Sequence, residues 1–336
     1  MRGVKSSGRV GAVYGGAPRR PPFGALTALV LAGVTVLTGC TSSGTPSPGG
    51  TSASAGASPS PRPTPVWNRT PASVAAVGDS MTRGFDACGV LVDCPEVSWA
   101  TGTDSGVRSL AYRLLGGGSA DVAGRTEGRA GSASDQVARR VAERSWNLAA
   151  TGARMADVPA QMTRAARHRP ELVTVMAGAN DACRKSAAQM TPVASFRTSF
   201  EEALRRLRAD APKAQVYVSS VPDLKRLWST GRANPLGRQV WKLGICATML
   251  GDSQDDSKAA QARRDLVYAR VVGYNTALKE VCAKDERCRY DGGEVFAYRF
   301  TGTQLSHWDW FHPSKDGQRR LAEIAYRNVT AESPPA

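Results

Sequence analysis

Histidine is scarce in this chain, which has three in 336 residues. Two of the three, His307 and His312, lie in one aromatic turn, HWDWFHPSKDG, near the C-terminus. The sequence has no CxxC pair and no histidine close to a cysteine, and this excludes the usual ligand spacings of zinc. We therefore expect no metal ion and no other cofactor, and a role for histidine that needs neither.

Two enzyme signatures are also missing. The chain contains no G-x-S-x-G sequence, which argues against an α/β-hydrolase, and no G-x-G-x-x-G or P-loop sequence, which argues against a nucleotide enzyme. Its 44 basic residues, of which 35 are arginine, are scattered and form no stripe with interleaved aromatics. The net charge of +15 therefore indicates a solvated basic surface and no nucleic-acid partner, while an anionic membrane or lipid stays compatible with it.

No apolar run in the sequence reaches the roughly 20 residues that span a membrane. The run GALTALVLAGVTVLTG follows five basic residues and no acid, which is typical of a secretory signal peptide, here residues 1–39. Removing those five charges from the total of +15 leaves +10. Arg19 and Arg20 also allow twin-arginine export, so the export route stays open.

The segment LTGC, which ends at Cys40, resembles the lipobox of bacterial lipoproteins, whose cysteine becomes a lipid-modified N-terminus. We expect an exported protein anchored through Cys40 to the outer face of the cytoplasmic membrane, or a secreted one if the signal peptide is of the ordinary kind. Residues 40–65 are rich in Ser, Pro, Thr and Gly and too poor in apolar side chains to fold, which predicts a disordered tether. One domain, 66–330, and a tail, 331–336, remain.

Six cysteines follow Cys40, and an even number behind an export signal indicates disulfides. Six cysteines allow 15 connectivities. Two short loops pair most naturally within themselves and leave one long-range pair, so the expected disulfides are Cys88–Cys94, Cys282–Cys288 and Cys183–Cys246.

Short apolar runs alternate with amphipathic stretches, a pattern typical of βαβ units. The predicted strands are 74–77, 145–149, 172–176, 216–221 and 294–298. Predicted helices include one that begins after Ser105 and one over SFRTSFEEALRRLRAD. We therefore predict a single three-layer α/β/α domain with a mostly parallel five-stranded sheet. Residues 225–262 are irregular in period and are interpreted as an insertion, of the kind that forms lids or binding loops.

Candidate site residues come directly after the predicted strands, because ligands of an open parallel sheet bind beyond the carboxyl ends of its strands. Ser80, in VGDSMTRG, is either a nucleophile or a helix N-cap. Gly152 lies at a bend where a backbone N–H can face a developing oxyanion. Asn180, in MAGANDAC, offers an amide donor, although asparagine in a loop often serves the turn itself.

In the aromatic turn, Asp309 precedes His312 by three residues, so its carboxylate can accept from the imidazole and orient it. His312 is therefore the predicted acid–base residue. His307 has no carboxylate three residues before it and is interpreted as a packed aromatic neighbour, and His168 as solvated. A second Gly-Asp-Ser, at 251–253, follows no predicted strand and is interpreted as a cap or loop.

These blocks together resemble the SGNH hydrolases, also called the GDSL lipase/esterase family: GDS at Ser80, ATGA at Gly152, GAND at Asn180 and DWFHP at His312, in the family's order. The stretches SWATG, GARMADVPAQ and ELVTVMAGANDAC resemble its phospholipase B-like branch, whereas Arg83 and the 225–262 insertion depart from the pattern. The resemblance implies a flavodoxin-like fold, and acyl transfer to Ser80 with His312 as the base and Asp309 as its orienting partner. It also implies an oxyanion hole made of the N–H groups of Ser80 and Gly152 and the amide of Asn180.

The predicted function is that of an extracytoplasmic serine hydrolase that cleaves acyl esters of lipids or phospholipids, as a monomer with a small-molecule or lipid ester as substrate. The same site would accept acetyl esters, so a carbohydrate deacetylase is the alternative enzyme. A catalytically silent lipid- or glycan-binding lipoprotein is the third hypothesis. It predicts gaps in the catalytic set, and the sequence has none.

Overall fold

The computed structural model of the chain describes residues 67–116 and 132–335. The predicted signal peptide at 1–39, the predicted lipidation site Cys40 and the predicted tether at 40–65 lie outside these residues. Within the described ranges, no helix is long and apolar enough to cross a membrane.

Five parallel strands form one sheet in the order β2-β1-β3-β4-β5. They are β1 (Val74–Gly78), β2 (Ser145–Asn147), β3 (Leu172–Met176), β4 (Gln215–Val218) and β5 (Cys288–Tyr290). Every residue of β1 and β3 is buried, as expected for strands covered on both faces. The order changes direction between β1 and β3, which is the point where doubly wound sheets bind ligands.

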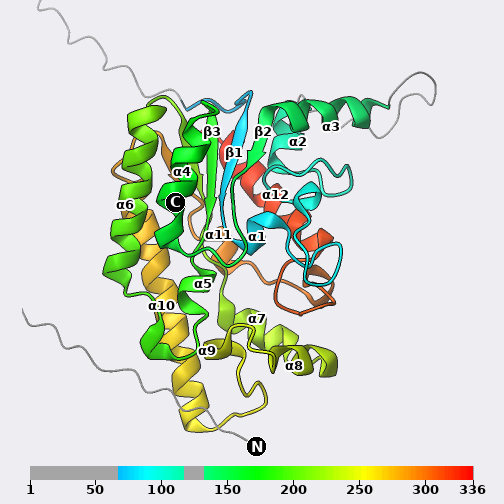
Figure 1. The fold of residues 1–336 in the computed structure, drawn as a ribbon, viewed down its shortest axis with the longest axis vertical. Coiled ribbons are helices and arrows are strands. Elements are labelled where there is room, and N and C mark those ends of the chain that lie inside the picture. The colour runs from blue at the N-terminus through cyan, green and yellow to red at the C-terminus, as the bar shows by residue number, and fades with distance from the viewer. Residues whose placement is uncertain (1–66, 117–131, 336) are drawn as a thin grey trace, which may run out of the picture. The chain divides into compact units, whose positions relative to one another are not determined.

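Helices cover both faces of the sheet and complete the predicted three layers (Figure 1). On one face lie α4 (Val158–Ala166), α6 (Val193–Asp210) and α10 (Lys258–Cys282). On the other lie α2 (Leu110–Leu115), α3 (Ala133–Arg144) and α12 (Lys315–Thr330). Helix α6 carries the apolar spacing that predicted it, since Phe196, Phe200, Leu204 and Leu207 are all buried.

Two local predictions are wrong. The fifth strand is Cys288–Tyr290, and the segment predicted as a strand at 294–298 contains the helix α11 (Glu294–Ala297). The Asp291 carboxylate accepts from the N–H of Gly293 at 2.8 Å and of Val295 at 3.1 Å, and these bonds turn the chain into a helix.

Helix α2 also begins later than predicted. Its N-cap is Ser109, whose Oγ accepts from the N–H of Tyr112 at 3.0 Å, and Ser105 lies in the preceding turn. Arg108 has φ +51°, a left-handed conformation that no helix beginning at Ser105 could contain.

The predicted insertion at 225–262 is folded into α7 (Leu224–Gly231), α8 (Pro235–Trp241) and α9 (Ala247–Leu250), followed by the start of α10. The buried Arg264 of α10 holds it in place. Its guanidinium lies 4.1 Å from the ring centre of Trp228 and donates to the carbonyls of Asp252 and Asp255, each at 2.8 Å. The Arg264 side chain therefore attaches the insertion to α10, because its guanidinium bonds to backbone carbonyls of the insertion and packs on the Trp228 ring.

Three disulfides join the pairs expected from the sequence, Cys88–Cys94, Cys183–Cys246 and Cys282–Cys288. The first closes a loop after β1 and the third joins the end of α10 to β5. The second attaches the insertion to the segment that follows β3, and this connection bears on the candidate site.

Candidate active site

The end of β1 is built to present Ser80. Gly78 has φ +145°, and a Cβ there would lie 2.0 Å from the carbonyl oxygen of Met176, so only glycine fits. The side-chain amide of Gln161 holds both backbone groups of Gly78, accepting from its N–H at 2.7 Å and donating to its carbonyl at 2.9 Å. Asp79 then caps the short helix α1 (Ser80–Arg83) by accepting from the N–H of Met81 at 3.0 Å. The N-cap is thus Asp79 and not Ser80, which leaves the Ser80 hydroxyl available for another contact.

That contact is with His312. The Nε2 atom of His312 lies 2.8 Å from Ser80 Oγ, although the two residues are 232 positions apart. The Nδ1 atom of His312 is hydrogen-bonded to Asp309 Oδ2. All three side chains are nearly buried, with exposed fractions of 6% for Ser80, 8% for His312 and 1% for Asp309. A hydroxyl, an imidazole and a carboxylate therefore form one continuous hydrogen-bonded chain.

The turn that carries Asp309 and His312 is fixed by its own backbone. The N–H groups of Phe311 and His312 both donate to Asp309 Oδ1 at 2.9 Å, and the N–H of Ser306 donates to the carbonyl of His312 at 2.7 Å. Trp310 takes φ +51°, which reverses the chain between the two functional side chains. Since Asp309 Oδ2 can only accept, Nδ1 carries the proton and Nε2 is left to accept from the Ser80 hydroxyl.

Charges around the imidazole set its titration. Burial alone would lower the pKa of His312, but the surrounding carboxylates, Asp309 above all, outweigh burial and raise it above the ordinary value of 6.5. Burial would likewise raise the pKa of Asp309, yet the adjacent imidazolium and the N–H donors lower it, so this carboxyl is charged.

Two further carboxyl groups lie next to this pair. Burial raises the pKa of Asp79 to about 7. Burial, together with the charge of Asp309, raises the pKa of Asp86 to about 6. A carboxyl oxygen of Asp86 lies within 4.8 Å of ligand-type atoms of both Asp309 and His312. Nothing in the sequence indicated Asp86, because it belongs to no motif and is brought here only by the loop that follows α1.

The loops that follow β2 and β3 are attached to each other. Asn180, in the short helix α5 (Ala179–Ala182), donates its side-chain amide to the carbonyl of Ala153 at 3.0 Å. Asp181 accepts from the N–H of Met155 at 2.8 Å. Gly152 has φ +82° and is exposed, and among the described residues its N–H has no acceptor. Two donors, one backbone and one side-chain, are thus held on neighbouring loops.

These loops also meet the end of β1. The N–H of Asp79 donates to the carbonyl of Met176 at 3.2 Å, and the N–H of Ala150 donates to that of Gly78 at the same distance. Ser80, Gly152 and Asn180 therefore follow three adjacent strands of the sheet. Backbone hydrogen bonds join the segments that carry them within a few residues of the strand ends. This is the edge of the sheet where the sequence predicted the site to lie.

The model of the GDSL-like lipase/acylhydrolase family matches residues 74–325, about three quarters of the sequence and nearly all of the described residues. The chain belongs to this family. This GDSL-like hydrolase is accordingly an enzyme of the esterase/lipase class, and its family activity is the hydrolysis of acyl esters. No curated protein matches it.

Solved structures resemble the GDSL-like hydrolase at low identity. A protein assigned as a GDSL-like lipase from Parabacteroides merdae is 14% identical, with a TM-score of 0.43. The superposition covers 79% of this chain and 98% of that protein. An extracellular lipase from Streptomyces rimosus is 19% identical, with a TM-score of 0.40, covering 77% and 99%. A phospholipase A1 from Streptomyces albidoflavus is 19% identical, with a TM-score of 0.38, covering 78% and 100%.

The other two histidines of the GDSL-like hydrolase lie away from Ser80. His307 is exposed and packs on Trp308 with ring centres 4.2 Å apart, and His168 is exposed and stacks on Trp146 at 4.5 Å. The second Gly-Asp-Ser, at 251–253, forms a turn after α9.

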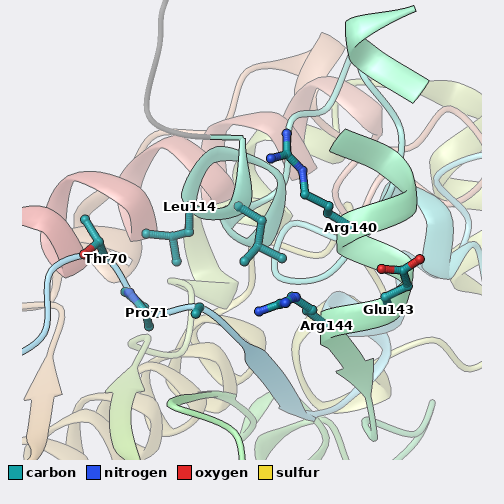
Figure 2. Close-up of a pocket in the computed structure, with 8 residues that line it drawn as sticks. Thr70, Pro71, Leu114, Arg140, Glu143 and Arg144 are labelled. Atoms are coloured by element: carbon teal, nitrogen blue, oxygen red, sulfur yellow. The ribbon is translucent and has the colours of Figure 1, made fainter. Parts of the chain in front are cut away.

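Two hollows formed by described residues lie at the other end of the strands. Figure 2 shows one of about 410 Å³ beside the start of β1, lined by residues of α2 and α3 and by Thr70 and Pro71. Another, of about 530 Å³, lies where β3 and β4 begin and is lined by Glu171 and Lys213 among others. Both are at the amino ends of the strands, whereas Ser80 follows a carboxyl end. We therefore assign the site from the side-chain geometry and not from the size of a cavity.

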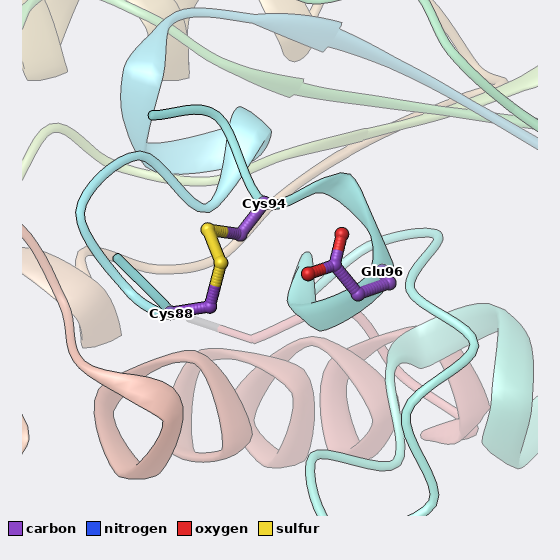
Figure 3. A group of neighbouring side chains, drawn as sticks. All are labelled: Cys88, Cys94 and Glu96. Atoms are coloured by element: carbon purple, nitrogen blue, oxygen red, sulfur yellow. A yellow bond between two sulfur atoms is a disulfide. The ribbon is translucent and has the colours of Figure 1, made fainter. Parts of the chain in front are cut away.

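Two clusters of potential metal ligands occur among the described residues. In the first, with Cys88, Cys94 and Glu96, the two sulfurs are bonded to each other, so no thiolate is present to bind an ion (Figure 3). In the second, with Asp86, Asp309 and His312, both ring nitrogens of the histidine already take part in hydrogen bonds. Neither cluster is suited to a metal ion as these residues are arranged.

Proposed function

We propose that this protein is an extracytoplasmic serine hydrolase that cleaves acyl esters of lipids or phospholipids through an acyl-enzyme on Ser80. The observation that carries the proposal is the hydrogen-bonded chain from Ser80 through His312 to Asp309. A nucleophile, a base and a group that orients the base, in contact in that order, form the constellation that acyl transfer requires.

The first half-reaction uses this chain directly. His312 Nε2 takes the proton of the Ser80 hydroxyl as Oγ attacks the ester carbonyl carbon, and the Asp309 carboxylate stabilises the imidazolium that forms. When the tetrahedral intermediate collapses, the carbon–oxygen bond to the alcohol breaks and His312 gives its proton to the departing oxygen. Water then attacks the acyl-enzyme with His312 again as the base, and the acid product and free Ser80 are released.

The negative charge of the intermediate requires donors aimed at the carbonyl oxygen. The proposed oxyanion hole consists of the backbone N–H groups of Ser80 and Gly152 and the side-chain amide of Asn180. Two observations support it: the unengaged N–H of Gly152, and the bond from Asn180 to Ala153, which uses one of the two amide hydrogens and leaves the other.

The extracytoplasmic location is supported by the three disulfides, which persist in oxidising compartments. Removal of a signal peptide at 1–39, lipidation of Cys40, a tether at 40–65 and a monomeric state belong to the same proposal. Metabolic labelling with a fatty acid tests the anchor. Label should be incorporated by the parent chain and lost in Cys40→Ser, and label that survives this substitution contradicts the assignment.

The nucleophile is tested with a fluorophosphonate probe, which reacts with activated serines. Ser80→Ala should abolish labelling without lowering the melting temperature. Ser253→Ala is the matched control, since Ser253 lies in the second Gly-Asp-Ser, is also buried and does not contact a histidine. Labelling that persists in Ser80→Ala and disappears in Ser253→Ala would show that Ser80 is not the nucleophile.

A substrate panel then separates the lipid esterase from the carbohydrate deacetylase. Esters of acetyl, medium and long acyl chains, a phospholipid and an acetylated polysaccharide are compared by kcat/KM. The proposal expects activity on medium or long chains, and activity confined to acetyl groups on a polysaccharide would favour the deacetylase.

A further inference from the structure

Large apolar side chains gather on one part of the surface. Of the nine large hydrophobic residues that are exposed among the described residues, six belong to three segments around the His312 turn: Val90, Leu91, Val92, Trp308, Leu236 and Leu243. Single exposed apolar side chains are normal on a soluble protein, but a group of them marks an interaction surface.

The first segment is the loop closed by the Cys88–Cys94 disulfide. Leu91 is its tip, with an exposed fraction of 71% and φ +56°, a conformation that leucine rarely adopts. The carboxylate of Asp86 holds the N–H of Leu91, and the N–H of Asp86 donates to the carbonyl of Val92 at 3.0 Å. The loop is thus fixed with its aliphatic side chains pointing into solvent, where they contribute no burial energy to the free protein.

This loop is joined to the turn that carries His312. Ser306 Oγ donates to the carbonyl of Asp86 at 2.7 Å and accepts from the N–H of Trp308 at 3.1 Å. Phe85, at the base of the loop, packs against the His312 ring with centres 5.0 Å apart. These contacts therefore connect the exposed Trp308 and the loop tip to the turn that carries the imidazole.

The third segment is α8 with the turn that follows it, and α8 lies against the His312 turn from the insertion side. Its inner face packs on Trp310: a Cβ on Gly237 would lie 3.1 Å from that indole, and Trp241 donates to the carbonyl of Asp309 at 2.7 Å. Leu236, in α8, and Leu243, in the turn that follows α8, are both strongly exposed, Leu243 to 83%. In Figure 1 the loop after α1, the orange segment before α12 and helix α8 all lie toward the same side of the molecule.

The charge of the insertion indicates what this surface contacts. Residues 224–251 contain five Lys or Arg and no Asp or Glu. Lys225, Arg226 and Arg232 each pair with an acid outside this range. Arg238 and Lys242 lie between the two exposed leucines in the sequence and have no acidic partner among the described residues, and Arg238 donates only to the carbonyls of Arg232 and Ala233. Apolar side chains beside unpaired cations match an anionic lipid surface, which takes apolar groups between its acyl chains and attracts cations at its head groups.

We propose that the Val90–Val92 tip, Trp308, Leu236 of α8 and Leu243 of the turn after it dock this enzyme on an anionic lipid surface and bring its site to esters presented there. The inference rests on the proposed function, because a lipid surface is where lipid esters are found. The inference adds a surface that recognises the lipid assembly, and this surface is separate from the residues that cleave the ester.

The test uses the full chain carrying Cys40→Ser, so that no lipid anchor contributes. Leu236→Ser combined with Leu243→Ser removes the two exposed leucines of α8 and the turn after it, and Leu266→Ser, at an exposed position on α10, is the matched control. Binding to vesicles of phosphatidylglycerol and phosphatidylcholine is measured by sedimentation, with fatty-acid release from them and kcat/KM on a water-soluble short-chain ester. The double variant should lose vesicle binding and vesicle hydrolysis by about 10-fold or more, because two leucine side chains no longer leave water when the protein binds. Its kcat/KM on the soluble ester and its melting temperature should match the parent, and Leu266→Ser should match the parent in every assay.

Four results would overturn the proposal. The double variant could bind and hydrolyse vesicles like the parent, or lose activity equally on the soluble ester, which would make α8 a structural support only. The double variant could instead convert a dimer into a monomer without lipid, which would assign the surface to a second copy of the chain. The protein could also bind phosphatidylglycerol vesicles and pure phosphatidylcholine vesicles equally at every salt concentration. That result would contradict an attraction between the cations of this surface and anionic lipid. Failure of the proposed function looks different, since the parent itself would then hydrolyse neither substrate.

Discussion

Trp241 donates its indole N–H to the backbone carbonyl of Asp309 at 2.7 Å, across 68 positions of sequence. The insertion therefore contacts the residue that holds His312. Shortly after Trp241, Cys246 is bonded to Cys183, just after the helix that carries Asn180, and Thr248 Oγ1 donates to the carbonyl of Ala182 at 2.8 Å. The insertion thus connects the two loops on which the proposed base and the proposed oxyanion donor lie.

Replacing Asp309 should disable the base while leaving the fold intact. In Asp309→Asn, the remaining oxygen can still accept from the N–H groups of Phe311 and His312, but the negative charge that stabilises the imidazolium is gone. We expect kcat on a soluble ester to fall about 10⁴-fold, with little change in melting temperature. A variant within 10-fold of the parent would contradict the role of Asp309.

The pH dependence should report the raised pKa of His312. The base must be neutral to take the serine proton, so kcat/KM should rise with pH, with a midpoint above 6.5. The Asp86 carboxylate contributes to this raised pKa, and it is charged above its own pKa of about 6.

Asp86→Asn removes that negative neighbour, so the midpoint of the kcat/KM profile should move to lower pH. Asp93→Asn is the control, since Asp93 lies on the same loop but pairs with Arg83 and is not among the charges that act on His312. The assignment fails if both substitutions shift the midpoint equally, or if neither does.

Asn180 should matter far more for turnover than for stability. Asn180→Ala removes one proposed oxyanion donor, and kcat should fall about 10²- to 10³-fold. Loss of its hydrogen bond to Ala153 should lower the free energy of unfolding by only about 1 kcal/mol. Asn180→Asp keeps the shape but puts a negative charge beside the developing oxyanion, so it should be at least as inactive. An Asp variant that keeps parental kcat would exclude Asn180 from the oxyanion hole.

The disulfides should differ in their effects. Cys183–Cys246 joins residues 63 positions apart, and its removal should lower the free energy of unfolding by about 4 kcal/mol, whereas Cys282–Cys288, with a separation of 6, should contribute about 2 kcal/mol. Paired Cys→Ser variants are compared in urea unfolding and in kcat. Since only the first pair connects the insertion to the Asn180 loop, mild reduction with dithiothreitol should lower activity before the protein unfolds. Activity that is lost only together with the fold would show that this connection does not position the site.

Two glycines near the site should differ in how much alanine destabilises the protein. Gly78→Ala forces a Cβ against the Met176 carbonyl in backbone that cannot move, so we expect a loss of about 3 kcal/mol or more and little soluble protein. Around Gly152 no atom lies within 4 Å of a Cβ, so Gly152→Ala bears only the left-handed backbone cost of about 1–2 kcal/mol and keeps its N–H. It should remain folded and active, and a melting temperature as low as that of Gly78→Ala would contradict the open surroundings of Gly152.

The local sequence pattern was sufficient to predict those elements whose structure depends on residues that are neighbours in the chain. The apolar runs of β1 and β3 and the helical spacing of α6 predicted these elements, because burial on both faces or along one stripe leaves a short-range signature. The segment at 294–298 misled because its alternation resembles a strand, while the carboxylate of Asp291, three residues earlier, captures the N–H groups of a turn. The start of α2 misled because Ser105 is a good cap by residue type, whereas the left-handed backbone of Arg108 moves the start of the helix to the cap at Ser109.

By itself the sequence determined the class of fold, the three disulfide pairs and the segments that end in Ser80, Gly152, Asn180 and the Asp309–His312 turn. Only the tertiary structure decided that Ser80 and His312 are in contact, that Asp86 lies beside them and that Trp241 holds the turn from the insertion. The physical reason is range: capping, periodicity and turn chemistry act over a few residues, whereas a hydrogen bond across 232 positions depends on how every intervening crossover packs on the sheet.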